Sequence, residues 1–268
     1  MSFLHIAVLA LVQGITEFLP VSSSGHLRLA EKLMSLPEQG FVLIVAVHVG
    51  SLGAVMIYFW RDLWAMAAGI GQLSSGRREP GARLAGWLIV ATIPVLIAGF
   101  AMKYYLSGGL DGIVVIAWTT LGFGVLLFIT DKIGMTVRRI EHLDFGDAVF
   151  IGLAQVLALI PGVSRSGITM SAARLLGLER TEAARFSMLL SIPAIIGAGT
   201  LVGIDLFRAG DAELTEAALI AAGLAFASAL ISIFALMAWL KRSTFTPFVV
   251  YRILLGGFLL AVSYGWLG

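Results

Sequence analysis

Two short segments of this sequence combine polar side chains with residues that break helices: residues 19–25 (Leu-Pro-Val-Ser-Ser-Ser-Gly) and residues 161–167 (Pro-Gly-Val-Ser-Arg-Ser-Gly). In each segment a proline, a glycine and a cluster of serines interrupt an apolar stretch. A helix that begins just after such a cluster, here at about residues 24–35 and 166–177, presents free backbone N–H groups and the positive end of its dipole. Both features favour the binding of an anion.

Side chains at these two breaks add further donors for an anion. Arg165 carries a planar guanidinium, which suits bidentate binding of phosphate. Two breaks that met at one point would surround a single anionic group, and phosphate matches these donors best. The expected hydroxyl and first-turn donors are Ser22, Ser23, Ser24, Gly25, Ser164, Ser166, Gly167 and Thr169.

The first segment has titratable groups that the second lacks. Glu17 lies four residues after Gln13, so both side chains fall on one face of the entering helix, and Gln13 joins the expected binding residues. In the second segment the positions that correspond to Glu17 and His26 are Leu159 and Ile168. The first segment therefore carries groups that can move protons or hold a metal, whereas the second binds negative charge.

Charge inside an apolar stretch is costly, which draws attention to Glu17 and Arg165. A charged side chain at the bilayer centre costs about 2.5–3.5 kcal/mol and marks function by default. A purely structural ion pair between Glu17 and Arg165 stays open as an alternative. His48, which has no charged neighbour in the sequence, is expected to be a structural hydrogen-bonding residue. Arg174 could contact phosphate or extend to the cytoplasmic interface.

The composition excludes most classes of soluble protein. Of the 268 residues, 59% are hydrophobic, 13% are charged and none is cysteine, whereas soluble domains have about 25% charged residues. These values exclude a soluble enzyme, a disordered chain, a nucleic-acid-binding protein and thiol chemistry. The net charge of +2 implies no polyanionic partner. The sequence predicts a polytopic membrane protein that is surrounded by membrane lipid.

Six apolar stretches are long enough to cross a bilayer, which takes about 20 residues. They are residues 41–60, 84–102, 112–130, 184–204, 217–240 and 248–267. Two others, residues 3–35 and 146–177, are broken at the serine clusters, and each half is too short to cross. Irregular backbone at membrane depth must be buried in protein or face water, so each is predicted to be a re-entrant helical hairpin. The expected fold is all-α, with six transmembrane helices plus two re-entrant hairpins.

Basic residues in the connections predict the orientation. Three connections are rich in Lys and Arg: 61–83, 131–147 and 241–247. Two are not: 103–111 and 205–216. By the positive-inside rule the first three are cytoplasmic and the other two face outward. Both ends of 3–35 and the C-terminus are then expected on the outer side, and both ends of 146–177 on the cytoplasmic side.

The two broken stretches also match each other. A shift of 142 residues, without a gap, aligns identical residues: Gln13 with Gln155, Val21 with Val163, Ser22 with Ser164, Ser24 with Ser166 and Gly25 with Gly167. Each copy is followed by three full spans, an odd number, so the second copy is inverted. Inverted repeats with broken helices place a site near the bilayer midplane, at the repeat interface. The chain is expected to be a single membrane domain, 1–268, with repeat halves of about 1–140 and 141–268.

The two segments resemble the signature motifs of a known family. Residues 13–26 (QGITEFLPVSSSGH) and 161–169 (PGVSRSGIT) are similar to the (E/Q)xxxE–serine–His and PGxSRSxxT motifs of bacterial undecaprenyl-diphosphate phosphatases, the bacitracin-resistance protein family. The resemblance implies a phosphoric anhydride hydrolase of the bacterial cytoplasmic (inner) membrane. It would convert undecaprenyl diphosphate to undecaprenyl phosphate and phosphate, recycle the lipid carrier of cell-wall synthesis and confer bacitracin resistance.

The resemblance also implies roles for single residues. Glu17 matches the essential acid and would bind a divalent metal, Mg²⁺ or Ca²⁺. His26 matches an acid or base, Ser23 a nucleophile and Arg165 the phosphate-binding arginine. Gln13 stands where many members have a second Glu, so the metal would be held largely by Glu17 and the diphosphate oxygens. The sequence leaves both Ser23 and water open as the attacking group.

Two other functions compete with this one. A lipid-phosphate transporter or flippase could share the architecture, but transport alone does not require Glu17, His26 and Arg165 together. The acid-phosphatase-like lipid phosphatases need a His after a Ser-Arg pair, and no His follows Ser164 and Arg165 in this chain. The oligomeric state is left open, with a homodimer as one option.

Overall fold

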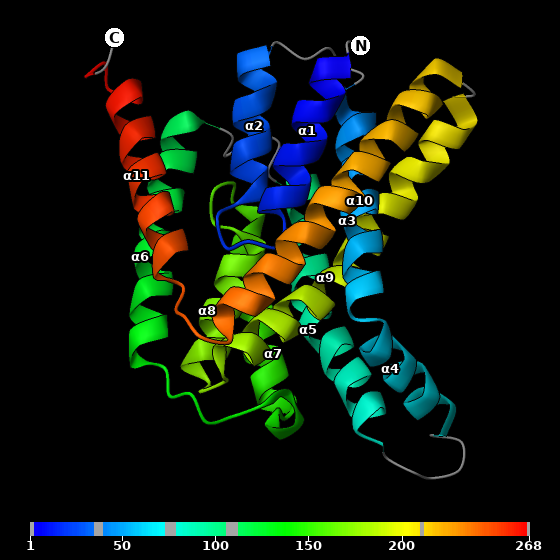
Figure 1. Cartoon of the computed structure of the whole chain (residues 1–268), viewed down its shortest axis with the longest axis vertical. Coiled ribbons are helices and arrows are strands. Elements are labelled where there is room, and N and C mark those ends of the chain that lie inside the picture. The colour runs from blue at the N-terminus through cyan, green and yellow to red at the C-terminus, as the bar shows by residue number, and fades with distance from the viewer. Residues whose placement is uncertain (1–2, 35–39, 73–78, 106–111, 210–211, 267–268) are drawn as a thin grey trace.

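The computed structural model describes residues 3–34, 40–72, 79–105, 112–209 and 212–266, and these form helices joined by short connections. In chain order the helices are α1 (Phe3–Thr16), α2 (Ser23–Met34), α3 (Gly40–Tyr58), α4 (Trp60–Gln72), α5 (Pro80–Tyr105), α6 (Ile113–Ile133), α7 (Phe145–Val156), α8 (Arg165–Leu175), α9 (Arg180–Ala209), α10 (Ala212–Leu240) and α11 (Thr246–Ser263) (Figure 1). Short 3-10 turns over Ile140–His142 and Leu157–Leu159 flank α7. The predicted all-α class is confirmed.

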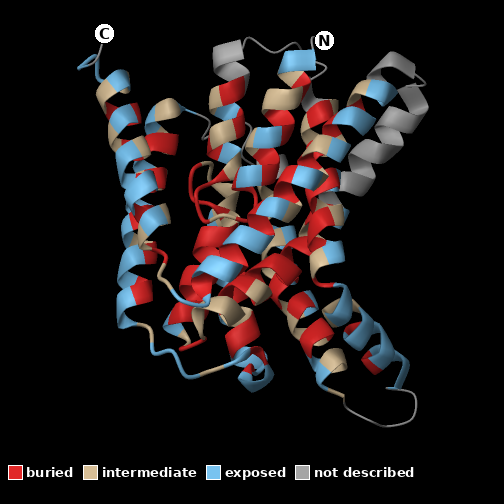
Figure 2. Cartoon of the chain, viewed as in Figure 1, coloured by how far each residue is buried: buried red, intermediate tan, exposed pale blue. Residues whose placement is uncertain are grey.

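Among the described residues, four helices are long and apolar enough to cross a membrane: Pro80–Met102, Ile113–Ile133, Thr215–Leu240 and Thr246–Ser263. They confirm four of the predicted spans as helices of the required length. The predicted span 184–204 lies in α9, but its side chains from residue 197 onward lie outside the described ones, so this span stays a prediction. The outward faces of the helices expose large apolar side chains, such as Leu254 at 68% (Figure 2). A chain that spans a membrane needs such a surface against lipid.

The predicted span 41–60 is a helix, α3, but the chain after it differs from the prediction. It bends by 77° at Phe59 and continues as a second helix, α4. The predicted connection 61–83 therefore contains a helix that the apolar pattern did not indicate. If α3 and α4 count as one broken span, the described part of the chain has up to five candidate spans.

Two contacts explain the direction of α4. Asp62, in its first turn, forms an ion pair with Arg185 of α9. Further along, α4 packs closely against α5, because a Cβ atom on Gly81 would lie only 2.1 Å from the carbonyl oxygen of Ala65. A glycine is needed for backbones to approach this closely. Both contacts join residues far apart in sequence, which is why the apolar pattern alone did not indicate the bend.

The two broken stretches form helical hairpins that enter the bundle from opposite ends (Figure 1). Helices α1 and α2 come from the end where both termini lie, and α7 and α8 come from the other end. Helices α2 and α8 begin at Ser23 and Arg165, within one residue of the predicted starts. The two breaks meet inside the bundle, where the Ser166 hydroxyl donates to the carbonyl oxygen of Leu19 at 2.9 Å.

The basic connection between α6 and α7 lies at the end of the bundle opposite the termini (Figure 1). The charge pattern predicts this relative placement. Residues 106–111 and 210–211, within the two connections that were predicted to face outward, lie outside the described residues. Which end of the bundle faces the cytoplasm therefore stays a prediction.

Candidate active site

Both hairpin breaks end in a serine with the same unusual backbone conformation. Ser22 has a φ of 78° and Ser164 a φ of 72°, in the left-handed region that residues with a side chain rarely adopt. Each hydroxyl accepts a hydrogen bond from a backbone N–H three residues further on, that of Gly25 at 3.3 Å and that of Gly167 at 3.1 Å. Each serine therefore caps the helix that follows and directs its N-terminus into the bundle. Backbone strain of this kind concentrates at functional sites.

The serine two residues after each capping serine lies beside it. The Ser22 and Ser24 oxygens lie 3.4 Å apart, and those of Ser164 and Ser166 lie 3.1 Å apart. Ser24 is exposed, whereas Ser166 is buried and donates to Leu19 of the other break. The hydroxyl of Ser24 is thus accessible to a ligand, while that of Ser166 joins the two hairpins.

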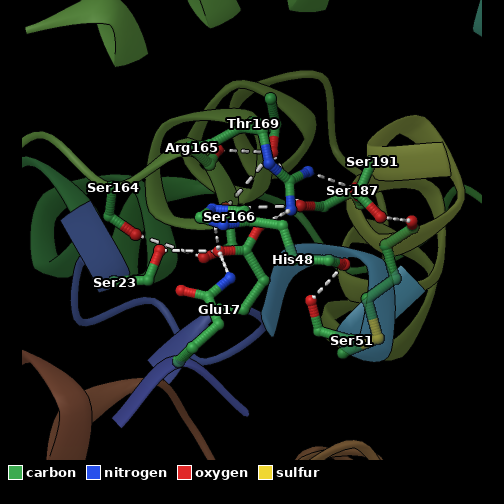
Figure 3. A network of polar contacts seen from close by, with 12 residues as sticks. Glu17, Ser23, His48, Ser51, Ser164, Arg165, Ser166, Thr169, Ser187 and Ser191 are labelled. Atoms are coloured by element: carbon green, nitrogen blue, oxygen red, sulfur yellow. Dashed lines mark hydrogen bonds and ion pairs between the residues drawn. The ribbon is translucent and has the colours of Figure 1, made fainter. Parts of the chain in front are cut away.

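The Glu17 carboxylate is the centre of a polar network inside the bundle (Figure 3). Its Oε2 accepts hydrogen bonds from Gln13 Nε2 at 2.9 Å and from Ser23 Oγ at 2.6 Å. Its Oε1 accepts one from Arg165 at 3.1 Å. Glu17 is only 7% exposed. The structure therefore brings Gln13, Glu17, Ser23 and Arg165 together from both hairpins.

Arg165 connects the second hairpin to two other elements. One terminal nitrogen donates to Glu17 of the first hairpin, and the other donates to the carbonyl oxygen of Ser187 on α9 at 3.1 Å. The ion pair with Glu17, which the sequence left open, is formed. The Arg165 side chain is 17% exposed, against 6% for that of Glu17. The guanidinium therefore lies at the more accessible side of the pair.

The hydroxyl of Thr169 is engaged within the protein. It donates to the carbonyl oxygen of Arg165 at 2.8 Å and lies 2.7 Å from the Ser187 hydroxyl. Thr169 is fully buried. These contacts fix the start of α8 against α9, and the predicted contact of Thr169 with substrate stays a prediction.

His26 makes its contacts outside the network around Glu17. Its Nδ1 lies 2.7 Å from the carbonyl oxygen of Ser22, and its Nε2 lies 2.6 Å from the hydroxyl of Tyr251 on α11. The two rings also stack. Because a carbonyl oxygen can only accept, Nδ1 carries a proton and Nε2 faces Tyr251. No local pattern marked Tyr251, which is 225 residues from His26 in sequence.

His48 lies beside Glu17 (Figure 3). Its Nδ1 is 2.6 Å from the carbonyl oxygen of Ile44 within α3, which leaves Nε2 directed at the Glu17 carboxylate, 3.9 Å away. The expected structural hydrogen bond of His48 is confirmed. His48 has no charged neighbour in the sequence, but it has one in the fold, because α3 packs beside the first hairpin and brings the two side chains together.

Arg252 on α11 is a second arginine at the breaks, and sequence reasoning missed it. It is fully buried and donates to the carbonyl oxygens of Pro20 at 3.2 Å and of Gly162 and Val163 at 3.0 Å each. Among the described residues it has no carboxylate partner in an ion pair. A charged residue in the middle of the apolar stretch 248–267 was the available signal.

Arg174, at the far end of α8, fits neither of its expected roles. It is fully buried and pairs with Asp131 of α6 at 3.3 Å, and it also donates to the carbonyl oxygens of Gly134 and Met135. Its donors are used in holding α8 to the end of α6, so it neither extends to an interface nor contacts the site.

The family comparison follows this geometry. The model of the family described as Bacitracin resistance protein BacA matches residues 6–258. The chain belongs to this family. The match includes both hairpins and the site residues from Gln13 to Arg252.

Relatives of this chain agree with it over nearly their whole length. Undecaprenyl-diphosphatase 1 of Rhodospirillum rubrum is 54% identical over 98% of this chain and 96% of its own. The undecaprenyl-diphosphatase of Ruegeria pomeroyi is 50% identical over 98% of this chain and 100% of its own. That of Alteromonas mediterranea is 48% identical over 97% of this chain and 98% of its own. The family resemblance of the two sequence motifs is confirmed.

Proposed function

We propose that this chain is an integral membrane phosphatase that hydrolyses undecaprenyl diphosphate to undecaprenyl phosphate and phosphate. The reaction recycles the lipid carrier of cell-wall synthesis and confers bacitracin resistance. The family, the names of the relatives and the candidate membrane spans support this activity. The observation that carries it is the Glu17–Arg165 pair at the meeting point of two capped helix N-termini. Such a point offers both positive charge and free N–H groups to a diphosphate.

The architecture that we propose for the enzyme has six transmembrane helices plus two re-entrant hairpins in an inverted repeat. The matching φ values and caps of Ser22 and Ser164, 142 residues apart, support repeat halves of about 1–140 and 141–268. The positive-inside rule supports a C-terminus on the outer side of the cytoplasmic membrane. The hairpin α1–α2 then enters from the outer side and α7–α8 from the cytoplasm.

The diphosphate binds where the two breaks meet, and its prenyl tail stays in lipid between helices. Arg165 and the first-turn N–H groups of α2 and α8 neutralise the charge on the transferring phosphoryl group, which is the main source of catalysis in phosphoryl transfer. Ser24 is exposed at the start of α2 and adds a hydroxyl donor. Glu17 keeps the Arg165 guanidinium at this position before substrate binds.

Ser23 and Glu17 form the attacking pair. The Ser23 hydroxyl donates to the carboxylate at 2.6 Å, so Glu17 accepts the proton as Ser23 Oγ bonds to the terminal phosphorus. The bond from that phosphorus to the bridging oxygen breaks, and undecaprenyl phosphate leaves. Water then releases phosphate from Ser23. In the alternative route water attacks directly, and His26 accepts its proton.

Ser23→Ala distinguishes the two routes. The covalent route requires the Ser23 oxygen, so loss of turnover supports it, whereas near-normal phosphate release would eliminate it and leave direct attack by water. The effect on Glu17 is limited, because its carboxylate keeps the hydrogen bonds from Gln13 and Arg165.

The residues present offer oxygen ligands to a divalent cation, Mg²⁺ or Ca²⁺. Beside the Glu17 carboxylate lies Gln13 Oε1, which is buried without a hydrogen-bond partner. The described residues contain no group of three or more metal-ligating side chains. Glu17 and Gln13 would therefore hold the ion together with diphosphate oxygens, as is common for Mg²⁺. A bound ion would supply positive charge that stabilises the phosphoryl group.

Neutralising the ion pair tests whether it is catalytic or only structural. Arg165→Gln alone leaves the buried Glu17 charge unpaired and costs about 3–5 kcal/mol of stability. The double variant Glu17→Gln/Arg165→Gln removes both charges, so we expect most of the stability to return while phosphate release stays about 100-fold or more below the parent.

The matched control is the pair Arg138–Asp147, a 2.6 Å ion pair at the first turn of α7. We expect Arg138→Gln/Asp147→Asn to keep its turnover. If Glu17→Gln/Arg165→Gln also turned over undecaprenyl diphosphate at the parent rate, the pair would be structural and the proposed site would be wrong.

A further inference from the structure

A polar cavity of about 440 Å³ lies away from the hairpin breaks. It is formed where three connections meet: the chain after α6, the start of α9 and the link from α10 to α11. Its lining residues are Thr136, Glu179, Arg180, Thr181, Leu240, Lys241, Arg242, Ser243 and Thr244. The volume falls within the range of about 300–1,000 Å³ that small-molecule sites occupy.

Positive charge dominates this cavity. Lys241 and Arg242 are both exposed and form no ion pair among the described residues. The carboxylate in the lining, Glu179, already pairs with Arg139 at 3.4 Å. Arg180 pairs with Asp131 at 2.7 Å. The charges of Lys241 and Arg242 are therefore left for an external anion.

The hydroxyls of the lining suit a phosphate group rather than a simple counterion. Thr181 and Ser243 add hydroxyl donors beside the two cations. The link that carries Lys241 and Arg242 is held in place, because Trp239 Nε1 donates to the carbonyl oxygen of Thr244 at 2.9 Å. A fixed link keeps Lys241, Arg242 and Ser243 at the cavity before any ligand binds.

Exposed apolar side chains lie close in sequence to the cavity lining. Ile133 and Met135, next to the Thr136 wall, are 65% and 70% exposed. Trp239, which holds the link, is 45% exposed. Tryptophan is enriched at the level of lipid headgroups. A ligand with a phosphate in the cavity and an apolar tail along the neighbouring helices would satisfy both surfaces.

We propose that this cavity binds the headgroup of an anionic glycerophospholipid, with its acyl chains against the exposed ends of α6 and α10. Lys241 and Arg242 contact the phosphate, and Thr181 and Ser243 contact its oxygens. Basic pockets between membrane helices are known to bind phospholipid headgroups. The site is separate from the one that we propose for the diphosphate, so it does not depend on the phosphatase activity.

Binding of phosphatidylglycerol to the purified full-length protein tests this site. Fluorescent phosphatidylglycerol would be titrated in neutral detergent, with phosphatidylcholine as the zwitterionic comparison. A cation near a membrane surface contributes about a fivefold change in affinity. We expect Lys241→Gln and Arg242→Gln each to weaken phosphatidylglycerol binding about fivefold, and the double variant about 25-fold, with little change for phosphatidylcholine.

Arg61→Gln is the matched control, because Arg61 is an exposed arginine on α4, outside the cavity. Equal weakening by Arg61→Gln would show non-specific attraction to surface charge and overturn the proposal, as would unchanged binding in the double variant. A competition experiment with inorganic phosphate distinguishes a lipid site from a site for free phosphate. If inorganic phosphate displaced the lipid at equal concentration, the cavity would be a site for free phosphate instead. Turnover of undecaprenyl diphosphate in each variant verifies that the protein is folded.

Discussion

Replacing Arg252 by methionine tests whether one buried cation holds the two hairpins in register. Arg252 donates to Pro20 of the first break and to Gly162 and Val163 of the second. These carbonyl groups belong to irregular backbone, where the helical partner of a carbonyl group is missing. Methionine has a similar length and no donor, so the substitution removes these three contacts while it fills much of the space. It also removes the contacts of Arg252 with the carbonyl oxygens of Thr119 and Thr120, but these groups lie within α6 and keep helical partners.

The size of the effect follows from these three contacts. A buried carbonyl group without a donor costs about 1–3 kcal/mol. The Gly162 carbonyl group keeps a long hydrogen bond from the Thr120 hydroxyl at 3.5 Å, so the three groups together cost roughly 5 kcal/mol. Removing the buried cation also removes its desolvation penalty, which offsets several kcal/mol of this loss. We therefore expect Arg252→Met to lose about 3 kcal/mol in the free energy of unfolding. If misalignment of Glu17 and Arg165 raises the activation free energy by the same amount, kcat falls about 100-fold.

Phosphate release from undecaprenyl diphosphate and unfolding in detergent measure the two effects on the same preparation. Arg252→Lys keeps the charge but has one ammonium group to serve both breaks, so we expect intermediate values. Arg61→Met, at an exposed arginine, is the control and should match the parent in both assays. This reasoning would be refuted if Arg252→Met had the same free energy of unfolding and the same rate of phosphate release as the parent. The Ser166–Leu19 contact and the Glu17–Arg165 pair would then suffice to hold the hairpins.

Two further predictions concern packing and buried charge. Gly50→Ala on α3 should lower the free energy of unfolding by about 1–3 kcal/mol, since its Cβ would lie 2.1 Å from the carbonyl oxygen of Ala222 on α10. Gly223→Ala, inside α10, meets no atom within 4 Å and should not destabilise the protein in the same unfolding assay, because alanine is the better helix former. Asp131→Asn should destabilise the protein by about 3–5 kcal/mol, because it leaves two arginines beside a buried neutral group. Thermal unfolding measures this loss, and an unchanged midpoint would contradict it.

Much of the fold could be predicted because its signals are local. Apolar runs of the right length indicated the helices α5, α6, α10 and α11 within a few residues. The breaks were equally clear, since Pro, Gly and Ser change the backbone where they stand. The bend after α3 was not predicted, because it depends on contacts of α4 with α5 and α9.

The candidate site also contains residues that local sequence signals indicated and residues that they did not. Gln13, Glu17 and Ser23 lie within eleven residues of one another, and their spacing alone placed them near one hairpin break. Arg165 was indicated by the cost of a charge in an apolar stretch. His48 carried no comparable signal, because nothing in α3 indicates that it packs beside Glu17.

Three features could be predicted from the sequence alone: the membrane environment, most of the helices and the two capped breaks. Each depends on composition or on residues that are neighbours along the chain. Which polar groups contact one another depends on the tertiary structure. It paired Glu17 with Arg165 across 148 positions, directed His26 to Tyr251, and placed Arg252 against both breaks. Such contacts depend on how whole helices pack, and no local spacing records that packing.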